Sequence, residues 1–219
     1  MKVLEWVYME DALGKLFGSP ARVKIMRLFL FNPEKVFGPA EIKVKSHVLS
    51  QVATSELSRL RAAGLIKRKK GVKEIEVTKG KKVAKKKKYI NGWSLNERFQ
   101  YLDALKSLLL SSKSFDRRII IKRFAGVGRV KVLLISGIFI KNDDSRIDIL
   151  IVGDYLKKSA IAKALRALEA EMGKELRYAA FGTKDFSYRL GMYDKFVRDI
   201  IDYPHERLID KVGIPGKKF

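Results

Sequence analysis

The 219-residue sequence contains no cysteine, two histidines and five prolines. Without cysteine, the chain has no disulfide framework, no thiolate metal site and no cysteine nucleophile. The two histidines, His47 and His205, leave little imidazole for acid–base chemistry or metal binding. We therefore predict neither a resident metal ion nor a cofactor.

Long hydrophobic stretches are also absent from the sequence. No apolar run approaches the ~18 residues of a membrane span, and the N-terminus lacks the hydrophobic segment of a signal peptide. The hydrophobic fraction of 47% is nevertheless ordinary for a globular protein and too high for a disordered chain. We predict a soluble, cytoplasmic protein folded as one large or two small domains.

Acidic residues are scarce, with 24 Asp and Glu against 47 Lys and Arg, which gives a net charge of +23. A charge of this size predicts a polyanionic partner, with nucleic acid ahead of an anionic membrane surface. A generally solubilising surface is the alternative. Residues 59–90 alone hold 14 basic and two acidic residues, so the charge is concentrated. We predict a nucleic-acid partner and no membrane partner.

The first half of the chain has the pattern of short helices separated by breaks. Gly18-Ser19-Pro20 ends one helix and begins the next, because Ser caps a helix N-terminus and Pro suits its first turn. The spacing within this second helix leaves two buried faces open, which are Val23, Arg27 and Leu30, or Ile25, Leu28 and Phe29. The predicted helices are 4–17, 21–31, 39–45 and 50–63, the last with Ala53, Leu57 and Leu60 buried and ended by Gly64.

Two basic strands follow the fourth helix. Residues 65–69 and 89–91 are strand-like and flank a long Lys/Gly segment, part of which the alternation Ile75-Glu76-Val77 indicates to be ordered. A helix–turn–helix followed by a two-stranded ribbon is the order of a winged helix-turn-helix. The stretch Leu57-Ser58-Arg59-Leu60-Arg61-Ala62-Ala63-Gly64-Leu65-Ile66-Lys67-Arg68 resembles the recognition-helix end and wing start of MarR- and ArsR-like regulators. The resemblance covers about residues 20–95 and implies a DNA-binding domain at residues 1–95.

That resemblance implies a recognition helix at about residues 50–63 in the major groove and a wing at about 65–90 on the phosphate backbone. Gln pairs with adenine and Arg with guanine in the major groove, whereas Lys suits backbone contact. If six wing residues neutralise phosphates, the log–log slope of affinity against salt would be about −5. The candidate DNA contacts are Ser50, Gln51, Thr54, Ser55, Ser58, Arg59 and Arg61 on the helix and Lys67, Arg68, Lys69, Lys70, Lys73, Lys79, Lys81, Lys82, Lys85, Lys86, Lys87 and Lys88 on the wing. A solvated face is the alternative for both sets, and His47 is interpreted as a turn residue.

The second half has the pattern of an α/β domain. A helix at 97–110 and the linker candidate Ser111-Ser112-Lys113-Ser114 precede it, so we assign residues 96–114 to a linker helix and 115–219 to this domain. The predicted strands are 130–135, 147–152 and 176–181, and the predicted helices are 115–124, 157–172 and 187–202. The predicted fold class is α/β overall (α+β).

Segments 133–139 and 145–154 resemble the minimal nucleotidyltransferase domain of the polymerase-beta-like superfamily. In that family a Gly-Ser pair opens a helix, an Asp-x-Asp lies on the next strand, and a third carboxylate follows, because several carboxylates hold Mg²⁺ on nucleotide phosphates. Here the pair is reversed as Ser136-Gly137, Arg146 stands in place of the first Asp, and only Asp148 remains. We therefore predict a degenerate remnant, consisting of Ser136, Gly137 and Asp148, with no catalytic residue.

The C-terminal run from Asp185 to His205 is similar to prokaryotic proteins that join a winged helix to a degenerate nucleotidyltransferase-like domain. This similarity implies a transcriptional regulator that binds double-stranded DNA and is not an enzyme. Two other hypotheses stay open, an active nucleotidyltransferase in which Asp143 or Asp144 replaces the missing ligand and an RNA- or ribosome-associated factor. A homodimer also stays open, because two-fold regulators read paired half-sites. His205 is interpreted as structural or solvent-facing.

Overall fold

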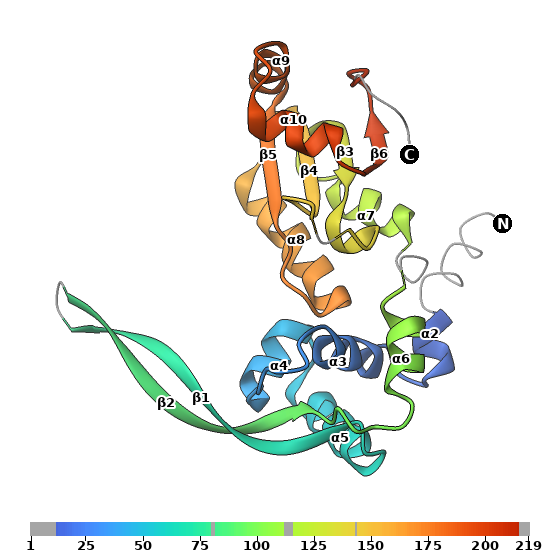
Figure 1. Ribbon diagram of the computed structural model, residues 1–219, viewed down its shortest axis with the longest axis vertical. Helices are drawn as coiled ribbons and strands as arrows, with labels where there is room; N and C mark the ends of the chain where they lie inside the picture. Colours follow the sequence, from blue (N-terminus) through green and yellow to red (C-terminus); the bar gives the residue numbers. More distant parts are fainter. Residues whose placement is uncertain (1–11, 80–81, 112–115, 143, 215–219) are drawn as a thin grey trace. The chain divides into compact units, whose positions relative to one another are not determined.

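Figure 1 shows the computed structural model, which describes residues 12–79, 82–111, 116–142 and 144–214. Within these residues the fold is mixed α/β, with one two-stranded and one four-stranded sheet. The chain divides into two compact units. Unit 1 comprises residues 1–110 and 170–174, and unit 2 comprises residues 111–169 and 175–219.

The described part of unit 1 begins with α2 (Ala12–Leu16), α3 (Pro20–Phe31), α4 (Pro39–Ser46) and α5 (Ser50–Ala62). The predicted start of α3 is confirmed, because Ser19 Oγ accepts the Arg22 N–H at 3.2 Å and Pro20 occupies the first turn. Its end is also as predicted, since the Asn32 side chain donates to Leu28 O at 2.8 Å. The predicted helix at 4–17 is described only from residue 12 onward, and its earlier residues lie outside the described ranges.

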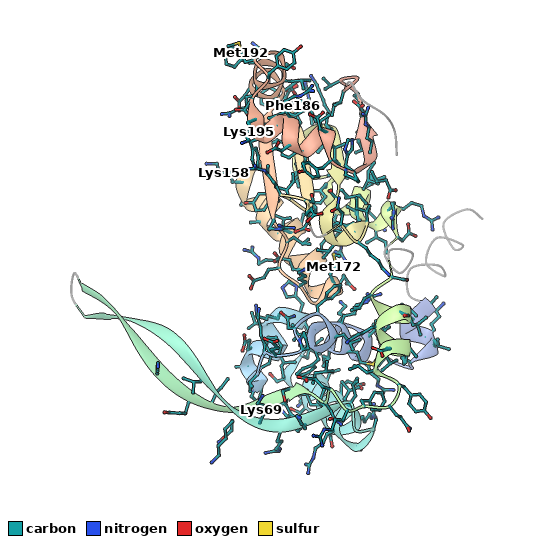
Figure 2. All side chains as sticks on the ribbon, in the orientation of Figure 1. Lys69, Lys158, Met172, Phe186, Met192 and Lys195 are labelled. Atoms are coloured by element: carbon teal, nitrogen blue, oxygen red, sulfur yellow. The ribbon has the colours of Figure 1, made fainter. Side chains whose placement is uncertain are left out.

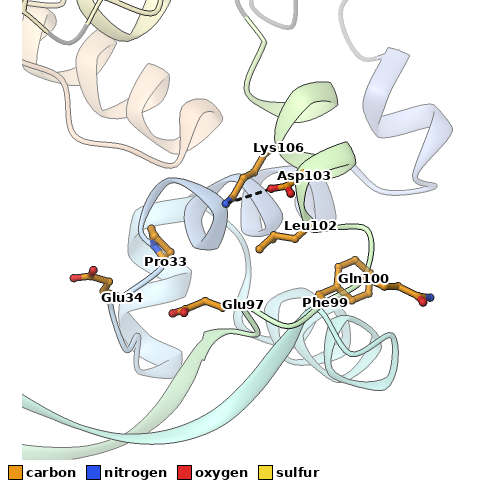
Figure 3. A pocket seen from close by; sticks show the side chains of 8 residues that line it. All are labelled: Pro33, Glu34, Glu97, Phe99, Gln100, Leu102, Asp103 and Lys106. Atoms are coloured by element: carbon orange, nitrogen blue, oxygen red, sulfur yellow. Dashed lines mark ion pairs between the residues drawn. The ribbon is translucent and has the colours of Figure 1, made fainter.

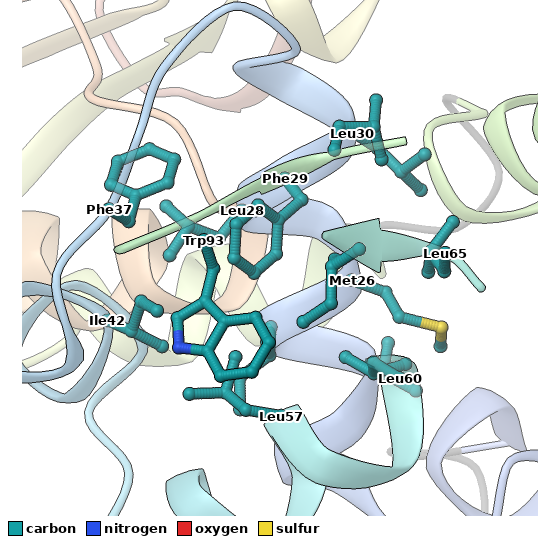
Figure 4. Packing of buried hydrophobic residues seen from close by; sticks show 14 of the residues in the cluster. Met26, Leu28, Phe29, Leu30, Phe37, Ile42, Leu57, Leu60, Leu65 and Trp93 are labelled. Atoms are coloured by element: carbon teal, nitrogen blue, oxygen red, sulfur yellow. The ribbon is translucent and has the colours of Figure 1, made fainter. Parts of the chain in front are cut away.

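Helix α3 is central to the core of unit 1. Both of the faces that its sequence left open are buried, and the full buried set is Val23, Ile25, Met26, Arg27, Leu28, Phe29 and Leu30. Figure 4 shows Leu57 and Leu60 of α5 and the indole of Trp93 in the same cluster. Each large apolar side chain removed from water contributes about 1.5–3 kcal/mol. This packing holds α5 against α3.

Helix α6 (Leu102–Leu109) is shorter than the predicted helix at 97–110. Residues 96–101 instead form successive turns closed by backbone hydrogen bonds, so the helix begins later. Leu102 and Leu109 are buried, and Leu109 O accepts a hydrogen bond from the buried Arg27 at 3.1 Å. Helix α6 therefore packs as part of unit 1.

Strands β1 (Ile66–Lys79) and β2 (Lys82–Leu95) form a two-stranded antiparallel ribbon. Both are much longer than the predicted strands at 65–69 and 89–91, so those bounds were wrong. Their pairing runs in register from Ile66↔Leu95 to Lys79↔Lys82. The lysine-rich sequence shows little hydrophobic alternation, so its pattern did not predict the full strands. The strands are held together by hydrogen bonds between them, which a local sequence pattern does not reveal. Figure 1 shows the ribbon as a long, twisted hairpin that extends from the helices of unit 1.

Unit 2 is built on a four-stranded sheet with the order β5-β4-β3-β6. Strands β4 and β5 are parallel, and the other two pairs are antiparallel. The strands are β3 (Arg129–Ile135), β4 (Ile149–Asp154), β5 (Tyr178–Gly182) and β6 (Glu206–Asp210), and the helices of this half are α7 (Arg117–Phe124), α8 (Lys158–Met172), α9 (Thr183–Gly191) and α10 (Lys195–Asp202). Val132, Leu134, Leu150 and Val152 of the sheet share a core with Phe186 of α9 and with the buried side chains of α10.

The predicted helix at 187–202 is wrong, because the chain forms α9 and α10 with a break between them. Tyr193 has a left-handed backbone (φ 55°), and Asp194 caps α10 by accepting the Val197 N–H at 3.0 Å. Strand β6 was not predicted, because its sequence does not alternate between apolar and polar residues. All five of its residues are partly buried. Among the described residues, no helix is both long and apolar enough to cross a membrane.

Candidate nucleic-acid interface

Helix α5 divides its residues between a buried and an exposed face. Ala53, Leu57 and Leu60 are buried, as their spacing predicted. All seven predicted contact residues are exposed, and these are Ser50, Gln51, Thr54, Ser55, Ser58, Arg59 and Arg61. The helix thus presents a polar face that ends in two arginines.

Glu56 is a buried carboxylate on α5 that the sequence reasoning missed. It is 3% exposed, and its oxygens lie 2.7 Å from Arg22 Nε on α3 and 3.2 Å from Arg59 Nη1. Burial raises the pKa of Glu56, but hydrogen bonds from Arg22 and Ser19 and the two arginine charges outweigh it and lower this pKa below its ordinary value. The sequence signal that could have predicted the burial of Glu56 is its spacing, because Glu56 lies three residues after Ala53 on the buried face of the helix.

The two arginines on the exposed face of α5 have different surroundings. Arg59 is held by Glu56 through its guanidinium, with a side chain 61% exposed. Within the part of the chain that the structure describes, no ion pair engages Arg61, which is exposed near the end of the helix. Of the two, Arg61 is therefore the arginine whose guanidinium N–H groups are open to a base or a phosphate.

Two apolar side chains lie exposed at the start of α5, and sequence reasoning missed both. Leu49, the N-cap residue, is 75% exposed, and Val52 is 39% exposed. Val52 directly follows Gln51, a residue type that pairs with adenine through its amide. Apolar side chains of this size contact the thymine methyl group in the major groove. The start of α5 thus presents an amide and apolar side chains, the two kinds of group that contact adenine and the thymine methyl group.

The two histidines have backbone and packing roles. His47 ends α4 in a left-handed conformation (φ 49°) and is exposed in the turn before α5. His205 is 3% exposed, its Nδ1 lies 2.9 Å from Tyr203 O, and its Nε2 accepts the Arg207 Nε–H at 3.3 Å. The buried His205 ring thus links Tyr203, which ends α10, to Arg207 of β6.

The base of the β1–β2 ribbon carries four consecutive exposed cations, Lys67, Arg68, Lys69 and Lys70. Figure 2 shows Lys69 on this part of the ribbon. The Arg68 guanidinium lies 4.9 Å from the ring centroid of its register partner Trp93, a cation–π contact that holds it in place. Lys87 on β2 is also exposed.

The other predicted wing residues are located by the backbone alone. Their positions on β1 or β2 are fixed by the register, and they are Lys73, Lys79, Lys82, Lys85, Lys86 and Lys88. Lys81 lies outside the described residues. The register thus places predicted contacts opposite one another that are up to 15 positions apart in sequence, as in the pair Lys73↔Lys88.

The segment Val36–Phe37 fixes the ribbon to the helices. Phe37 and Trp93 exchange two backbone hydrogen bonds of 2.9 Å. Val36 lies over Gly71, where an added Cβ would approach the Val36 Cβ to 2.8 Å, and at Gly92 an added Cβ would collide with Phe37 O. The two glycines therefore permit a close approach that anchors the base of the wing.

In unit 2, Asp148 is 1% exposed and bonded to backbone on two sides. Its Oδ1 accepts the Ile138 N–H at 3.1 Å, and its Oδ2 accepts the Arg177 N–H at 2.8 Å. Gly137 has φ 55°, and a Cβ there would collide with Asp148 Oδ1. The carboxylate thus joins the turn after β3 to the segment before β5.

The surroundings of Asp148 contain a cation and internal hydrogen bonds, and the cation is Arg177, whose Nε lies 3.4 Å from Asp148 Oδ2. Ser136 Oγ donates to Pro204 O at 2.7 Å, and Arg146 pairs with Asp199 at 2.6 Å. Asp144 lies in the preceding turn, where its N–H donates to Asn142 Oδ1, and Asp143 is outside the described residues. In the described ranges, no group of three or more His, Asp or Glu side chains could hold a metal ion.

Unit 1 also has an acidic recess of about 480 Å³ beside α6 (Figure 3). Glu34, Glu97 and Asp103 line it together with Phe99 and Leu102. Lys106 pairs with Asp103 at 3.9 Å across the helix surface. Its carboxylates would repel phosphate, so we do not include this recess in the candidate interface.

Comparisons of the chain with protein-family models, with curated proteins and with solved structures find no match.

Proposed function

We propose that the chain is a DNA-binding transcriptional regulator in which unit 1 is a winged helix-turn-helix domain. Helix α5 enters the major groove, and the β1–β2 ribbon acts as the wing on the phosphate backbone. The exposed face of α5 carries this proposal, because every polar residue of this helix that is expected to contact DNA is exposed while its apolar spacing residues are buried. A solvent-exposed helix with this division is free to dock.

The order of elements supports the winged-helix interpretation. Helices α3, α4 and α5 precede an antiparallel two-stranded ribbon, which is the order of that class. Buried on both faces, α3 supports α5, whose 13 residues extend about 20 Å. Short Ser and Thr side chains on its outer face allow the close approach that a groove about 12 Å wide requires.

In this proposal, unit 2 resembles a nucleotidyltransferase domain that has lost its catalytic carboxylates. Both oxygens of Asp148 accept backbone N–H groups, and Arg146 brings a cation close to it in sequence. The rival hypothesis of an active enzyme requires labelled nucleotide to be incorporated with Mg²⁺ or Mn²⁺. We expect no incorporation above that of a blank without protein.

The DNA-binding proposal is tested by duplex affinity with a matched pair of double variants. Gln51→Ala/Arg61→Ala removes one amide and one guanidinium from the exposed face of α5. Arg98→Ala/Gln100→Ala removes the same two groups from exposed positions outside α5. Each bidentate base contact is worth about 1–3 kcal/mol, so we expect at least a tenfold loss of affinity for a selected duplex in the first variant only.

Equal affinity of both variants and the parent protein would overturn the role of α5. Tighter binding of structured RNA than of duplex DNA would favour the RNA-associated alternative. Neither double variant changes a buried residue, so thermal unfolding should match the parent chain and exclude misfolding as the cause.

A further inference from the structure

The β1–β2 ribbon has two faces of different charge. Its register is unbroken from Ile66↔Leu95 to Lys79↔Lys82, and successive residues of a strand belong to opposite faces. Every second residue of β1, together with its register partners on β2, therefore shares one face. The residues can be assigned to faces from the backbone alone.

One face contains both acidic residues of the ribbon, and we call it the mixed face. It begins at Ile66 and includes Arg68, Lys70, Glu74 and Glu76 on β1 and Lys85 and Lys87 on β2. The opposite face has no acidic residue, and we call it the lysine face. Its cationic residues are Lys67, Lys69, Lys73 and Lys79 on β1 and Lys82, Lys86 and Lys88 on β2.

Cross-strand pairing makes the difference between the faces sharper. On the mixed face, Glu74 is opposite Lys87 and Glu76 is opposite Lys85, which are favourable pairs. On the lysine face, Lys73 is opposite Lys88 and Lys79 is opposite Lys82. Like charges at directly opposed positions destabilise a sheet. A polyanion on the lysine face would remove this repulsion, whereas the two glutamates of the mixed face already offset two of its four cations.

The chain segment just before α4 packs against part of the lysine face. Gly71 and Gly92 belong to this face, and the Val36 side chain lies close to both glycines. Lys67 and Lys69, the lysines nearest the base, are exposed. From Lys67 to Lys79 the strand extends about 40 Å, which exceeds the ~34 Å of one DNA helical turn. The spacing allows phosphate contacts over more than one turn.

We propose that the lysine face binds the phosphate backbone of duplex DNA and that the mixed face points away from it. This proposal rests on the proposed function, since it assumes that unit 1 binds the duplex through α5. It specifies which face of the ribbon contacts DNA, whereas the net charge of the ribbon does not. The wing then contacts DNA through the lysines of one face, contributed by both strands, rather than through all the basic residues of the ribbon.

The test compares two triple variants that remove equal charge at similar distances along the ribbon. Lys73→Gln/Lys86→Gln/Lys88→Gln changes the lysine face, and Lys70→Gln/Lys85→Gln/Lys87→Gln changes the mixed face. Duplex affinity is measured for each from 50 to about 300 mM salt. Because each phosphate contact contributes about 0.9 to the slope, we expect the log–log slope to become shallower by roughly 2.7 in the lysine-face variant and by less than about 1 in the mixed-face variant.

Equal changes in the two triple variants would overturn the sided wing, as would a larger change in the mixed-face variant or no change in either. These outcomes leave the proposed function intact if the unmodified chain binds the duplex and loses affinity in Gln51→Ala/Arg61→Ala. Failure of the unmodified chain to bind any duplex would instead overturn the proposed function itself. Circular dichroism and thermal unfolding of both triple variants verify that the ribbon substitutions leave unit 1 folded.

Discussion

Glu56 shows how a single residue links the core to the proposed interface. Its carboxylate is buried, holds Arg22 at 2.7 Å and contacts Arg59 at 3.2 Å. The cluster ties the start of α3 to the middle of α5, and it uses one of the two arginines on α5 that the sequence offered as DNA contacts. At this scale the sequence identified which residues on α5 are exposed but not which arginine is engaged, because the partner Arg22 is 34 positions away.

Replacing Glu56 by Gln is expected to lower the free energy of unfolding by about 1–3 kcal/mol, because Arg22 loses a charged hydrogen-bond partner. Urea unfolding followed by the fluorescence of the buried Trp93, in a Trp6→Phe background that removes the second tryptophan, measures this loss. Glu97→Gln, which changes an exposed carboxylate, serves as the control and should be within about 0.5 kcal/mol of the parent.

The stabilisation by Glu56 should also depend on pH. Because the pKa of Glu56 is lower in the folded chain than its ordinary value of 4.5, its contribution is fully present above that value and is lost as the pH falls through the folded pKa. The difference between parent and Glu56→Gln should therefore be large at pH 7 and shrink below about pH 4.5. A difference that stays constant down to pH 3 would contradict this assignment.

Val52 gives a second prediction at the residue scale, conditional on the proposed function. If its exposed side chain contacts a thymine methyl group, replacing that thymine by uracil in a selected duplex should weaken binding by about 1 kcal/mol, or roughly fivefold. The same substitution should have little effect on Val52→Ala, which has already lost the apolar contact. Equal sensitivity of both proteins to uracil would exclude Val52 as the reader.

At the scale of elements, local patterns predicted the helices better than the wing. The cap at Ser19-Pro20 and the spacing Ala53, Leu57, Leu60 are short-range signals, and α3 and α5 agree with them. The full length of β1 and β2 depends on pairing between residues up to 29 positions apart, which no local window contains. The α9–α10 break is likewise set by one left-handed residue, Tyr193, that apolar spacing does not reveal.

The glycines at the base of the ribbon test how the wing is anchored. Gly71→Ala should cost about 1–3 kcal/mol because its Cβ meets the Val36 side chain, and Val36→Gly should relieve part of that cost. Gly92→Ala meets the backbone carbonyl of Phe37 as well as the Val36 side chain, and a substitution at Val36 leaves that carbonyl in place, so Val36→Gly should leave most of its cost. A double-mutant cycle monitored by Trp93 fluorescence in the same Trp6→Phe background measures both couplings, and equal rescue of the two glycine variants would contradict this packing.

At the scale of the whole molecule, unit 1 contains the basic ribbon, and in unit 2 the carboxylate of Asp148 has a structural role. Asp148 binds two backbone N–H groups from separate segments, so Asp148→Asn should destabilise unit 2 by about 2–3 kcal/mol, since an amide presents an N–H₂ group toward one of those donors. Asp144→Asn, in an exposed turn, is the matched control and should unfold like the parent. Unchanged stability in Asp148→Asn would contradict the structural role.

The central claim is that α5 reads DNA sequence, and selection from a random duplex library at about 150 mM salt tests it most directly. The account predicts that the full chain enriches a defined motif and that Gln51→Ala/Arg61→Ala loses it, while Arg98→Ala/Gln100→Ala retains it. Salt-sensitive binding without any enriched motif, unchanged in the α5 variant, would contradict sequence-specific regulation and leave only the lysines of the ribbon as a binding surface.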